Sequence, residues 1–467
     1  MLTPEVLAPA MFAALALVLL AGFPVSFSIA AVGAVFGAIG IAAGHFHPQF
    51  LLAGTLRIEG FFHNDNLLAI PLFVFMGMLL ERTRIAADML ITLDELFGKV
   101  RGGMAYTVVL VGATLAAITG FVSAAVIGIA LIALPAMLRK GYDARLATGV
   151  IAASGTLAQI LPPSLVLIVL AEQLEVPLLE MYRGALLPSA LLVLLYLAYV
   201  YLTTRLWPQR APAGAEAGGV SMPSARQWRA AAVAAGFPIG LILAVLASIY
   251  FGIATPSEGG AVGVTGVLLL GLVRRQLDLP RLRQAMESTG VLCSGLLFLL
   301  FGASFFTLVF RGLDGQVWIE SLFAHIPAGQ LGFLIFVNVA IFFIAFFLDF
   351  FEIAFIVLPL IAPVARKLGI DMTWFAVLLA VNLQTSFMHP PFGIALYNLR
   401  SVAPPSVRTT QIYRGAIPFL LIQLLVVALL IAVPSIVLRT ESTPVNVDNV
   451  EIPMPPPPER DEEPQKQ

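Results

Sequence analysis

The chain has 467 residues, of which 59% are apolar and only 11% are charged, and its formal net charge is −1. Soluble proteins carry about 25% charged residues, so this composition excludes a set of water-soluble domains. The mean hydropathy of +0.96 indicates a membrane protein instead. The net charge gives no support for nucleic-acid binding, and the single Cys293 excludes a disulfide framework or a thiolate metal cluster.

The apolar residues fall into stretches long enough to cross a membrane, which takes about 20 residues in a helix. No basic residue precedes the first stretch, so we expect a retained span rather than a cleaved signal peptide. In chain order we predict ten crossings, at 5–22, 24–44, 66–82, 144–174, 184–205, 230–252, 256–273, 288–310, 372–400 and 415–438.

Two further apolar segments, 104–138 and 331–365, are too long for one upright span and too short for two. Polar or small residues interrupt each segment near its midpoint, namely Thr119, Gly120 and Ser123 in the first and Asp349 and Glu352 in the second. Non-helical backbone is tolerated at this depth where it lines a cavity in the protein. We therefore predict two re-entrant helical hairpins that reach the middle of the membrane and return.

Two of the crossings contain a double proline near their centre, Pro162–Pro163 in the first and Pro390–Pro391 in the second. Prolines remove backbone donors and clash with the preceding turn, so an α-helix cannot continue through either pair. We predict a functional, unwound loop at each break. The polar or small residues beside the two breaks are Ser154, Gly155, Thr156 and Ser164, and Asn382, Gln384, Thr385, Ser386, His389 and Gly393.

The chain also repeats itself. The two double prolines are 228 residues apart, and the same offset relates Pro135 to Pro363, Gly141 to Gly369 and Asp143 to Asp371. We predict a first repeat at 1–205, a loop at 206–229, a second repeat at 230–438 and a disordered tail at 439–467. Within the repeats, 5–82 and 230–310 supply the scaffold spans.

The distribution of basic residues indicates how the chain is oriented. An odd number of crossings in each repeat makes the second repeat inverted relative to the first. With the N-terminus outside, 18 of the 26 Lys and Arg residues fall inside, in agreement with the positive-inside rule. The basic residues left outside are Arg57, Arg183, Arg311, Arg366, Lys367, Arg439, Arg460 and Lys466.

These features predict an all-α polytopic membrane protein of two inverted repeats, each with about five crossings and a re-entrant hairpin. Inverted repeats with helices that are broken at the membrane centre are typical of secondary transporters. Unwound backbone frees carbonyls for a cation, and half-helix N-termini offer N–H groups to an anion. Asp349 and Glu352 need a partner at this depth: a bound cation, a proton, or neighbouring donors in a structural pair.

Four stretches together resemble the large membrane subunit of tripartite ATP-independent periplasmic (TRAP) transporters, and the resemblance covers almost the whole chain. They are 69–77 (AIPLFVFMG), the break from Gly155 to Ser164, 255–258 (TPSE) and the break at 390–393 (PPFG). Two more stretches, 348–352 (LDFFE) and 382–386 (NLQTS), are similar to the subgroup for α-keto acids, mannitol or chloroaromatic compounds.

The resemblance implies a sodium-driven importer of small organic acids in the bacterial inner membrane. The substrate class would be a C4-dicarboxylate or a 2-oxo or 2-hydroxy monocarboxylate, with no cofactor besides the coupling ion. Two partners are implied, a periplasmic solute-binding protein and a small four-helix membrane subunit. The implied fold is the ion-transporter-superfamily elevator fold, in which hairpins and broken helices move together against a scaffold.

The resemblance also places the sites. One cation site would lie between the first hairpin tip and the first break, at Thr119, Gly120, Ser123, Ser154, Gly155 and Thr156. The second cation site would involve Asp349, Asn382, Thr385 and Ser386. Substrate would lie between the hairpin tips, near Ser123, Pro162, Pro163, Ser164, Glu352, Gln384, His389, Pro390, Pro391 and Gly393.

Alternatives remain open at this point. His389 stands where the family commonly has threonine, so it is either a neutral hydrogen-bonding side chain or a sign that protons take part in coupling. A self-sufficient carboxylate:cation symporter of the same fold shares the mechanism, and the sequence does not separate the two. An intramembrane enzyme needs a catalytic constellation, and neither HExxH nor GxSxG occurs, so we expect no enzymatic activity.

Overall fold

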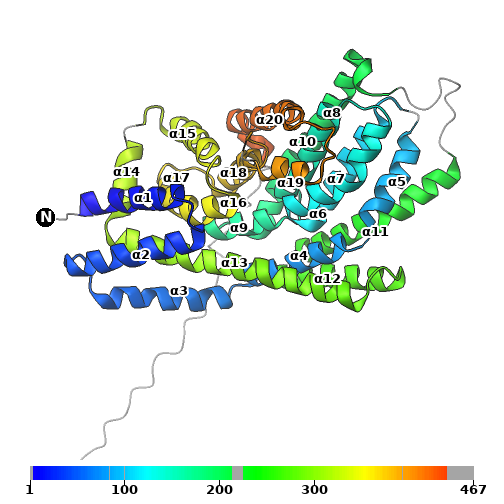
Figure 1. Ribbon diagram of the computed structural model, residues 1–467. Helices are drawn as coiled ribbons and strands as arrows, with labels where there is room; N and C mark the ends of the chain where they lie inside the picture. Colours follow the sequence, from blue (N-terminus) through cyan, green and yellow to red (C-terminus); the bar gives the residue numbers. More distant parts are fainter. Residues whose placement is uncertain are drawn as a thin grey trace, which may run out of the picture.

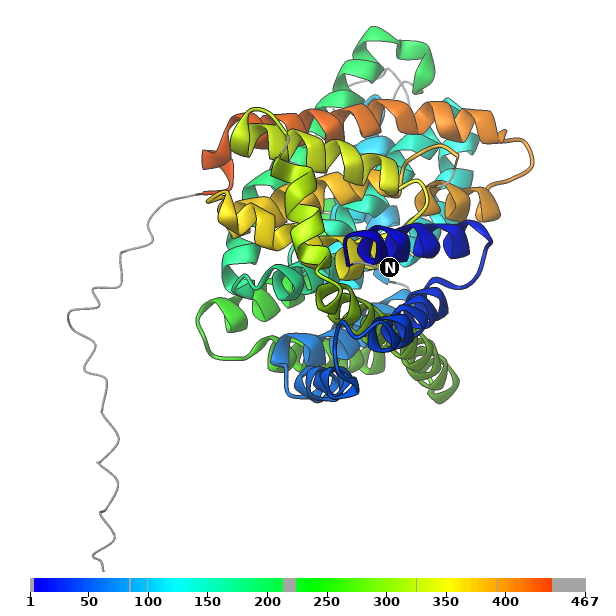
Figure 2. The same ribbon diagram turned by 90° about the vertical axis from the view of Figure 1, so that its left-hand side faces the viewer.

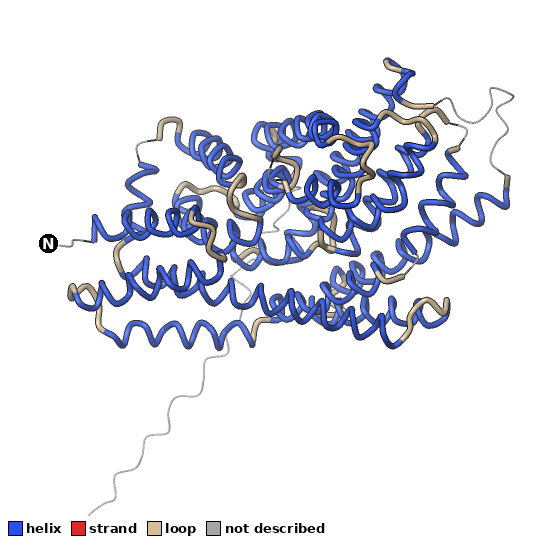
Figure 3. Tube along the Cα trace, in the orientation of Figure 1, coloured by secondary structure: helices blue, strands red, loops and turns tan. Residues whose placement is uncertain are grey.

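The computed structural model describes residues 4–83, 85–98, 100–212, 224–324, 326–391 and 393–438. Helices form almost all of this part of the chain, and it contains no strand (Figure 3). The predicted tail at 439–467 and the centre of the predicted loop, 213–223, lie outside the described residues.

The helices of the first half follow the predicted spans, with additional helices between the second and third spans and between the third span and the first hairpin. In chain order they are α1 Pro4–Leu20, α2 Val25–Ala42, η1 Pro48–Leu52, α3 Ala53–Phe62, α4 Asp65–Glu81, α5 Ile85–Phe97, α6 Gly103–Thr119, α7 Val122–Arg139, α8 Ala144–Thr156, η2 Leu157–Gln159, α9 Leu165–Leu174, α10 Leu178–Leu206 and η3 Pro208–Arg210.

The second half repeats this order. Its helices are α11 Ala225–Tyr250, α12 Pro256–Val273, α13 Leu279–Gly312, α14 Gly315–Ala324, α15 Gly329–Ile344, α16 Phe350–Glu352, the π-helix η4 Ile353–Val357, α17 Leu358–Lys367, α18 Met372–Ser386, α19 Ile394–Val402, α20 Thr409–Ala432 and η5 Pro434–Ile436.

Seven of these helices are individually long and apolar enough to cross a membrane. The number of possible spans rises to nine if each of two bent helix pairs is counted as one span. The predicted crossings at 144–174 and 372–400 are absent from this number because each consists of two short helices, α8 with α9 and α18 with α19. In both, the helix ends before the double proline and resumes after it, as the loss of backbone donors requires.

Residues at equivalent positions in the two halves cap equivalent helices. Asp143 caps α8 by accepting from the backbone N–H groups of Arg145 and Leu146, and Asp371, 228 residues later, caps α18 by accepting from the N–H of Trp374. An aspartate at this position satisfies a donor that the helix itself leaves free. The repeat seen in the sequence is therefore a repeat in structure.

The two halves are interlocked rather than side by side (Figures 1 and 2). Helix α2 packs on α13 while α12 packs on α4, and α8 packs on α20 while α18 packs on α10. Equivalent helices of the two halves thus make equivalent contacts with the other half, as expected if an approximate two-fold operation relates the halves. The fold is all-α and polytopic, with two inverted repeats, as the sequence predicts.

The broken helices occupy the centre of the molecule (Figure 1). Every residue of α8 from Leu146 to Thr156 is buried, and so is every residue of α18 from Trp374 to Ser386. Helices on the periphery, such as α11 and α12, expose many apolar side chains, as lipid-facing helices do. The helices that lead into the two breaks, α8 and α18, are consequently shielded by protein on all sides over these residues.

Candidate functional site

The first hairpin turns within two residues. Helix α6 ends at Thr119, Gly120 takes a left-handed conformation with φ of +62°, and α7 begins at Val122. Thr119 is buried and its Oγ1 has no hydrogen-bond partner among the described residues, while Ser123 is half-buried in the first turn of α7. The tip therefore presents one unsatisfied hydroxyl inside the protein.

The first hairpin tip lies directly against the first break. A carbon-β added at Gly155 would lie 2.3 Å from a side-chain carbon of Val126, and one added at Gly120 would lie 3.4 Å from Leu165. Ser154 is fully buried here and donates to the carbonyl of Val150 at 2.6 Å, which leaves its lone pairs free. The structure thus packs Gly155 against α7 close to the tip, while Ser154 packs against Gly112 of α6, further from the tip.

Thr156 belongs to a different cluster of polar side chains. Its hydroxyl donates to the carbonyl of Ala153 at 2.8 Å and accepts from the amide of Gln384, 228 residues away, at 3.1 Å. Repeat-related residues touch only near the axis that relates the repeats, so this contact marks the centre of the pseudo-symmetry. The predicted cation residue Thr156 and the predicted substrate residue Gln384 are therefore hydrogen-bonded to each other.

Two residues that the sequence did not single out complete this polar cluster. The amide of Gln423 on α20 donates to the hydroxyl of Tyr196 on α10 at 2.9 Å and to that of Thr156 at 3.3 Å. All four side chains are fully buried. Gln423 is the only amide side chain in the predicted span 415–438, and that was the signal in the sequence.

The second hairpin tip is held by its own two acids. Asp349 Oδ1 accepts from the backbone N–H of Glu352, and Glu352 Oε2 accepts from the backbone N–H of Asp349, each at 2.9 Å. This reciprocal capping box starts the short helix α16. The π-helix Ile353–Val357 follows at once, a local widening that is frequent at functional sites.

A cavity of about 290 Å³ opens at this tip, between the second hairpin and the second break. Three polar residues line it, Asp349, Glu352 and Ser386, and the rest of the lining is apolar: Ala345, Phe346, Phe347, Leu348, Phe387 and Ile394. None of these described lining residues is basic. Two carboxyl groups without a basic partner in an apolar cavity favour a cation as ligand.

Of the other residues of the second predicted cation site, Ser386 lines this cavity, whereas Asn382 and Thr385 are not in its lining. Asn382 is buried on α18 and donates to the carbonyl of Asn338 on α15 at 2.8 Å, which joins the broken helix to the hairpin. Thr385 and Ser386 each donate to a carbonyl one turn earlier in α18, at 2.6 Å. Their hydroxyl oxygens keep lone pairs with which to accept or to coordinate.

His389 is buried between two aromatic rings of the second hairpin. Its ring lies 4.2 Å from that of Phe342 and 4.5 Å from that of Phe346, measured between centroids. Neither ring nitrogen has a hydrogen-bond partner among the described residues. His389 therefore joins the second break to the hairpin by ring packing, and it does not line the cavity that Asp349 faces.

The loops at the two breaks are built differently. Both double prolines, Pro162–Pro163 and Pro390–Pro391, have a cis peptide bond. Ser164 is fully buried, donates to the carbonyls of Ala158 and Gln159, and caps α9. In the second break, the N–H of Gly393 donates to the carbonyl of His389 at 2.6 Å. Pro391 is exposed, whereas Pro162 and Pro163 are buried.

The described residues offer no preformed transition-metal site. No group of three or more His, Cys, Asp or Glu side chains in them could hold a metal ion. The donors that do converge are carboxylate, hydroxyl and carbonyl oxygens, which suit a hard cation.

Comparison with known proteins places the chain among transporter permeases. A family model described as the tripartite ATP-independent periplasmic transporter, DctM component, matches residues 12–436. The chain is 27% identical to the C4-dicarboxylate TRAP transporter large permease protein DctM of Pseudomonas aeruginosa, over 84% of this chain and 90% of that one. It is 26% identical to the ectoine/5-hydroxyectoine TRAP transporter large permease protein UehC of Ruegeria pomeroyi, over 92% and 98%.

A third relative and a solved structure agree with this placement. The isethionate TRAP transporter permease protein DctMQ of Oleidesulfovibrio alaskensis is 25% identical, over 92% of this chain and 65% of that one. The crystal structure of the YdaH transporter of Alcanivorax borkumensis matches with a TM-score of 0.58 at 16% identity, over 92% and 98% of the two chains, which supports the fold alone. These relatives are permeases and not enzymes. The chain is a multi-pass membrane protein that belongs to the DctM family of TRAP transporter large permeases.

Proposed function

We propose that this chain is the large transmembrane subunit of a sodium-driven importer of small organic acids. The observation that carries the proposal is the cavity at the second hairpin tip, where Asp349, Glu352 and Ser386 meet with no basic residue in the described lining. An isolated charge in the membrane interior costs at least about 2.5 kcal/mol, so such a site gains from a bound cation. Carboxylate, hydroxyl and carbonyl oxygens are suitable ligands for Na+.

The direction and the partners of the proposed transport follow from the family. Its name describes a tripartite periplasmic system, and we propose a periplasmic solute-binding protein and a small four-helix membrane subunit as the two partners, in the bacterial inner membrane. The relatives named above are permeases for C4-dicarboxylates, ectoines and isethionate, all small polar solutes with an ionised group. For this chain, the residues 348–352 and 382–386 favour 2-oxo or 2-hydroxy monocarboxylates.

The proposed movement is of the elevator type. The two hairpins and the two broken helices would carry cation and substrate together past a scaffold of the outer helices. In support, each hairpin is in direct contact with its neighbouring broken helix, through Gly155 and Val126 in one repeat and through Asn382 and Asn338 in the other. Such contacts make each hairpin and its neighbouring broken helix one packed body.

Reconstitution tests the proposal. Proteoliposomes would contain this chain with or without the small subunit, and the binding protein would be supplied outside, loaded with radiolabelled pyruvate, lactate or succinate. We expect uptake only when all three proteins and an inward Na+ gradient are present. A non-cognate binding protein loaded with the same acid is the matched control. Uptake by this chain alone would contradict the tripartite assignment and favour a self-sufficient carboxylate:cation symporter.

A further inference from the structure

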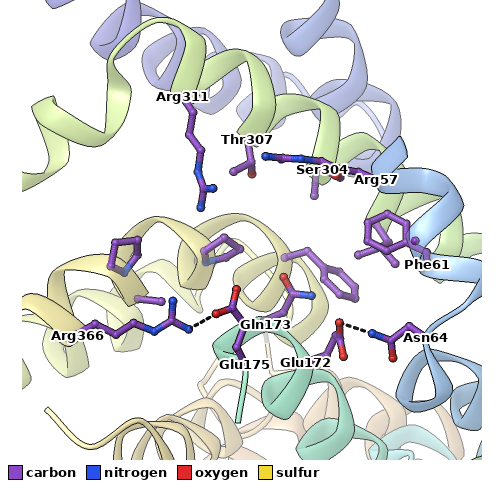
Figure 4. Close-up of a pocket in the computed structure, with 17 residues that line it drawn as sticks. Arg57, Phe61, Asn64, Glu172, Gln173, Glu175, Ser304, Thr307, Arg311 and Arg366 are labelled. Atoms are coloured by element: carbon purple, nitrogen blue, oxygen red, sulfur yellow. Dashed lines mark hydrogen bonds and ion pairs between the residues drawn. The ribbon is translucent and has the colours of Figure 1, made fainter. Parts of the chain in front are cut away.

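A second and larger cavity lies away from the hairpin tips. It measures about 400 Å³ and has two walls (Figure 4). Helices α3 and α13 form one wall and carry Arg57 and Arg311, and helices α9 and α17 form the other wall. By the distribution of basic residues, the chain segments at this cavity are predicted to lie on the outer side of the membrane.

Arg366, Glu175 and Glu172, the charged side chains on the wall of α9 and α17, all have partners. Arg366 forms an ion pair with Glu175 at 2.8 Å and donates to the carbonyl of Leu174 at 3.0 Å. Glu172 accepts from the amide of Asn64 at 2.7 Å and, more weakly, from that of Asn66 at 3.4 Å. Glu175 thus neutralises Arg366, and the two neutral amides engage both oxygens of Glu172, which keeps its negative charge.

The two arginines of the opposite wall have no such partner. Neither Arg57 nor Arg311 makes a hydrogen bond or an ion pair with any described residue, and both extend into the cavity beside Ser304 and Thr307 (Figure 4). Both guanidinium groups line the same cavity, so their like charges repel each other there. An anion placed between them would relieve this repulsion, and a planar carboxylate fits the guanidinium fork with two parallel hydrogen bonds.

We propose that Arg57 and Arg311 form a receiving site for small carboxylate or sulfonate anions on the outer face of this permease. The proposal rests on the proposed import function for its direction, and it adds a binding site ahead of the hairpin tips. The cavity bridges the predicted scaffold, through α3 and α13, and the predicted moving unit, through α9 and α17. Its volume suits a small ligand, and unpaired charges in a cleft raise the local concentration of counter-ions.

A cysteine reporter tests the site without requiring transport. Ser304→Cys places a thiol on the cavity wall that carries the arginines, and Cys293→Ala removes the native thiol. The purified chain in lipid-free detergent is treated with the anionic reagent MTSES or the cationic reagent MTSET. The ratio of the two rates measures the local potential and is independent of the reactivity of the thiol itself. We expect the MTSES/MTSET ratio to fall by about tenfold in Arg57→Gln/Arg311→Gln.

Three controls show whether the change in the MTSES/MTSET ratio comes from the charges of Arg57 and Arg311. Arg283→Gln removes one positive charge from the exposed surface of the same helix and is expected to leave the ratio unchanged. Arg57→Lys/Arg311→Lys keeps both charges and should keep the ratio. If the glutamine variant does not fold, protection of the reporter thiol by an anion still tests the proposal. Succinate should slow MTSES modification at constant ionic strength, whereas neutral succinamide should not. An unchanged ratio in the glutamine variant, or equal protection by succinamide, would overturn the proposal even in a chain that imports organic acids.

Discussion

The side chains of Asp349 and Glu352 have two separate roles, one through their hydrogen bonds and one through their charges. One oxygen of each holds the backbone N–H of the other residue, so the pair shapes the hairpin tip. The charge of each group is a separate property, because Asn and Gln would accept the same hydrogen bonds. The structure therefore supports the structural pair that the sequence left open, and it leaves the charges free for a cation in the adjoining cavity.

Asp349→Asn separates the two roles, because it keeps the hydrogen-bond acceptor and removes the charge. Asparagine caps helices as well as aspartate does, so the hairpin should keep its shape while it loses a charge. We expect the Na+ concentration for half-maximal uptake to rise at least about tenfold, the factor that 1.4 kcal/mol of lost binding represents. Uptake at graded Na+ in proteoliposomes measures it.

Asp278→Asn is the matched control, because Asp278 also caps a helix, α13, by accepting from the N–H of Arg281 at the surface. It should leave the Na+ dependence unchanged. If Asp349→Asn behaved like Asp278→Asn, the carboxylate would have no part in binding the cation.

At the scale of the elements, close backbone contacts join the two repeats. Helix α8 crosses α20 so closely that a carbon-β added at Gly149 would lie 2.2 Å from the carbonyl oxygen of Gly415. Backbone cannot yield to such an atom as a flexible side chain can. Small residues at helix crossings are the usual means of close packing in membranes.

Gly149→Ala should therefore force α8 and α20 apart. We expect a destabilisation of about 1–3 kcal/mol, the usual cost of overpacking, and a lower apparent Tm in detergent by tryptophan fluorescence. Gly236→Ala on α11 is the control, since a carbon-β there meets nothing within 4 Å. A Gly149→Ala protein as stable as Gly236→Ala would show that the crossing is looser than described.

The sequence predicted the elements where a local physical rule applies. Double prolines must end a helix, and a long apolar segment with a polar midpoint must turn back, so the breaks and hairpin tips could be placed. Helix α13 begins at Leu279, ahead of the predicted start at 288, because Asp278 caps it and hydrogen bonding continues through charged residues. Hydropathy reports the depth in the membrane and not where a helix starts.

The site was less predictable than the elements. Thr156 and Gln384 were assigned to separate sites, yet they are hydrogen-bonded to each other with Tyr196 and Gln423 nearby. Which side chains meet at a pseudo-symmetry axis depends on how the two halves dock. No pattern within either half contains that information.

At the scale of the whole molecule, the proposed elevator mechanism requires one part of the chain to move against another. Asn64 precedes α4 of the predicted scaffold, and its amide contacts Glu172 on α9 of the predicted moving unit at 2.7 Å. A short bis-methanethiosulfonate should link Asn64→Cys to Glu172→Cys in a Cys293→Ala background. We expect the link to abolish uptake, and reduction with dithiothreitol to restore it.

A second cysteine pair controls for the cross-linking itself. Arg82, the residue that follows α4, donates to the hydroxyl of Ser288 on α13 at 3.3 Å, and both helices belong to the predicted scaffold. Linking Arg82→Cys to Ser288→Cys should leave uptake intact. Full uptake with Asn64→Cys linked to Glu172→Cys would contradict movement of α9 against the scaffold.

The most direct test of the central claim is uptake driven by a sodium gradient alone. Proteoliposomes that hold this chain and the small subunit receive the loaded binding protein, with Na+ high outside, equal on both sides, or replaced by choline, and with an imposed proton gradient as a separate arm. We predict accumulation of the labelled acid above its external concentration only with the inward Na+ gradient, and its loss in Asp349→Asn. Accumulation in choline, driven by the proton gradient, would contradict sodium coupling.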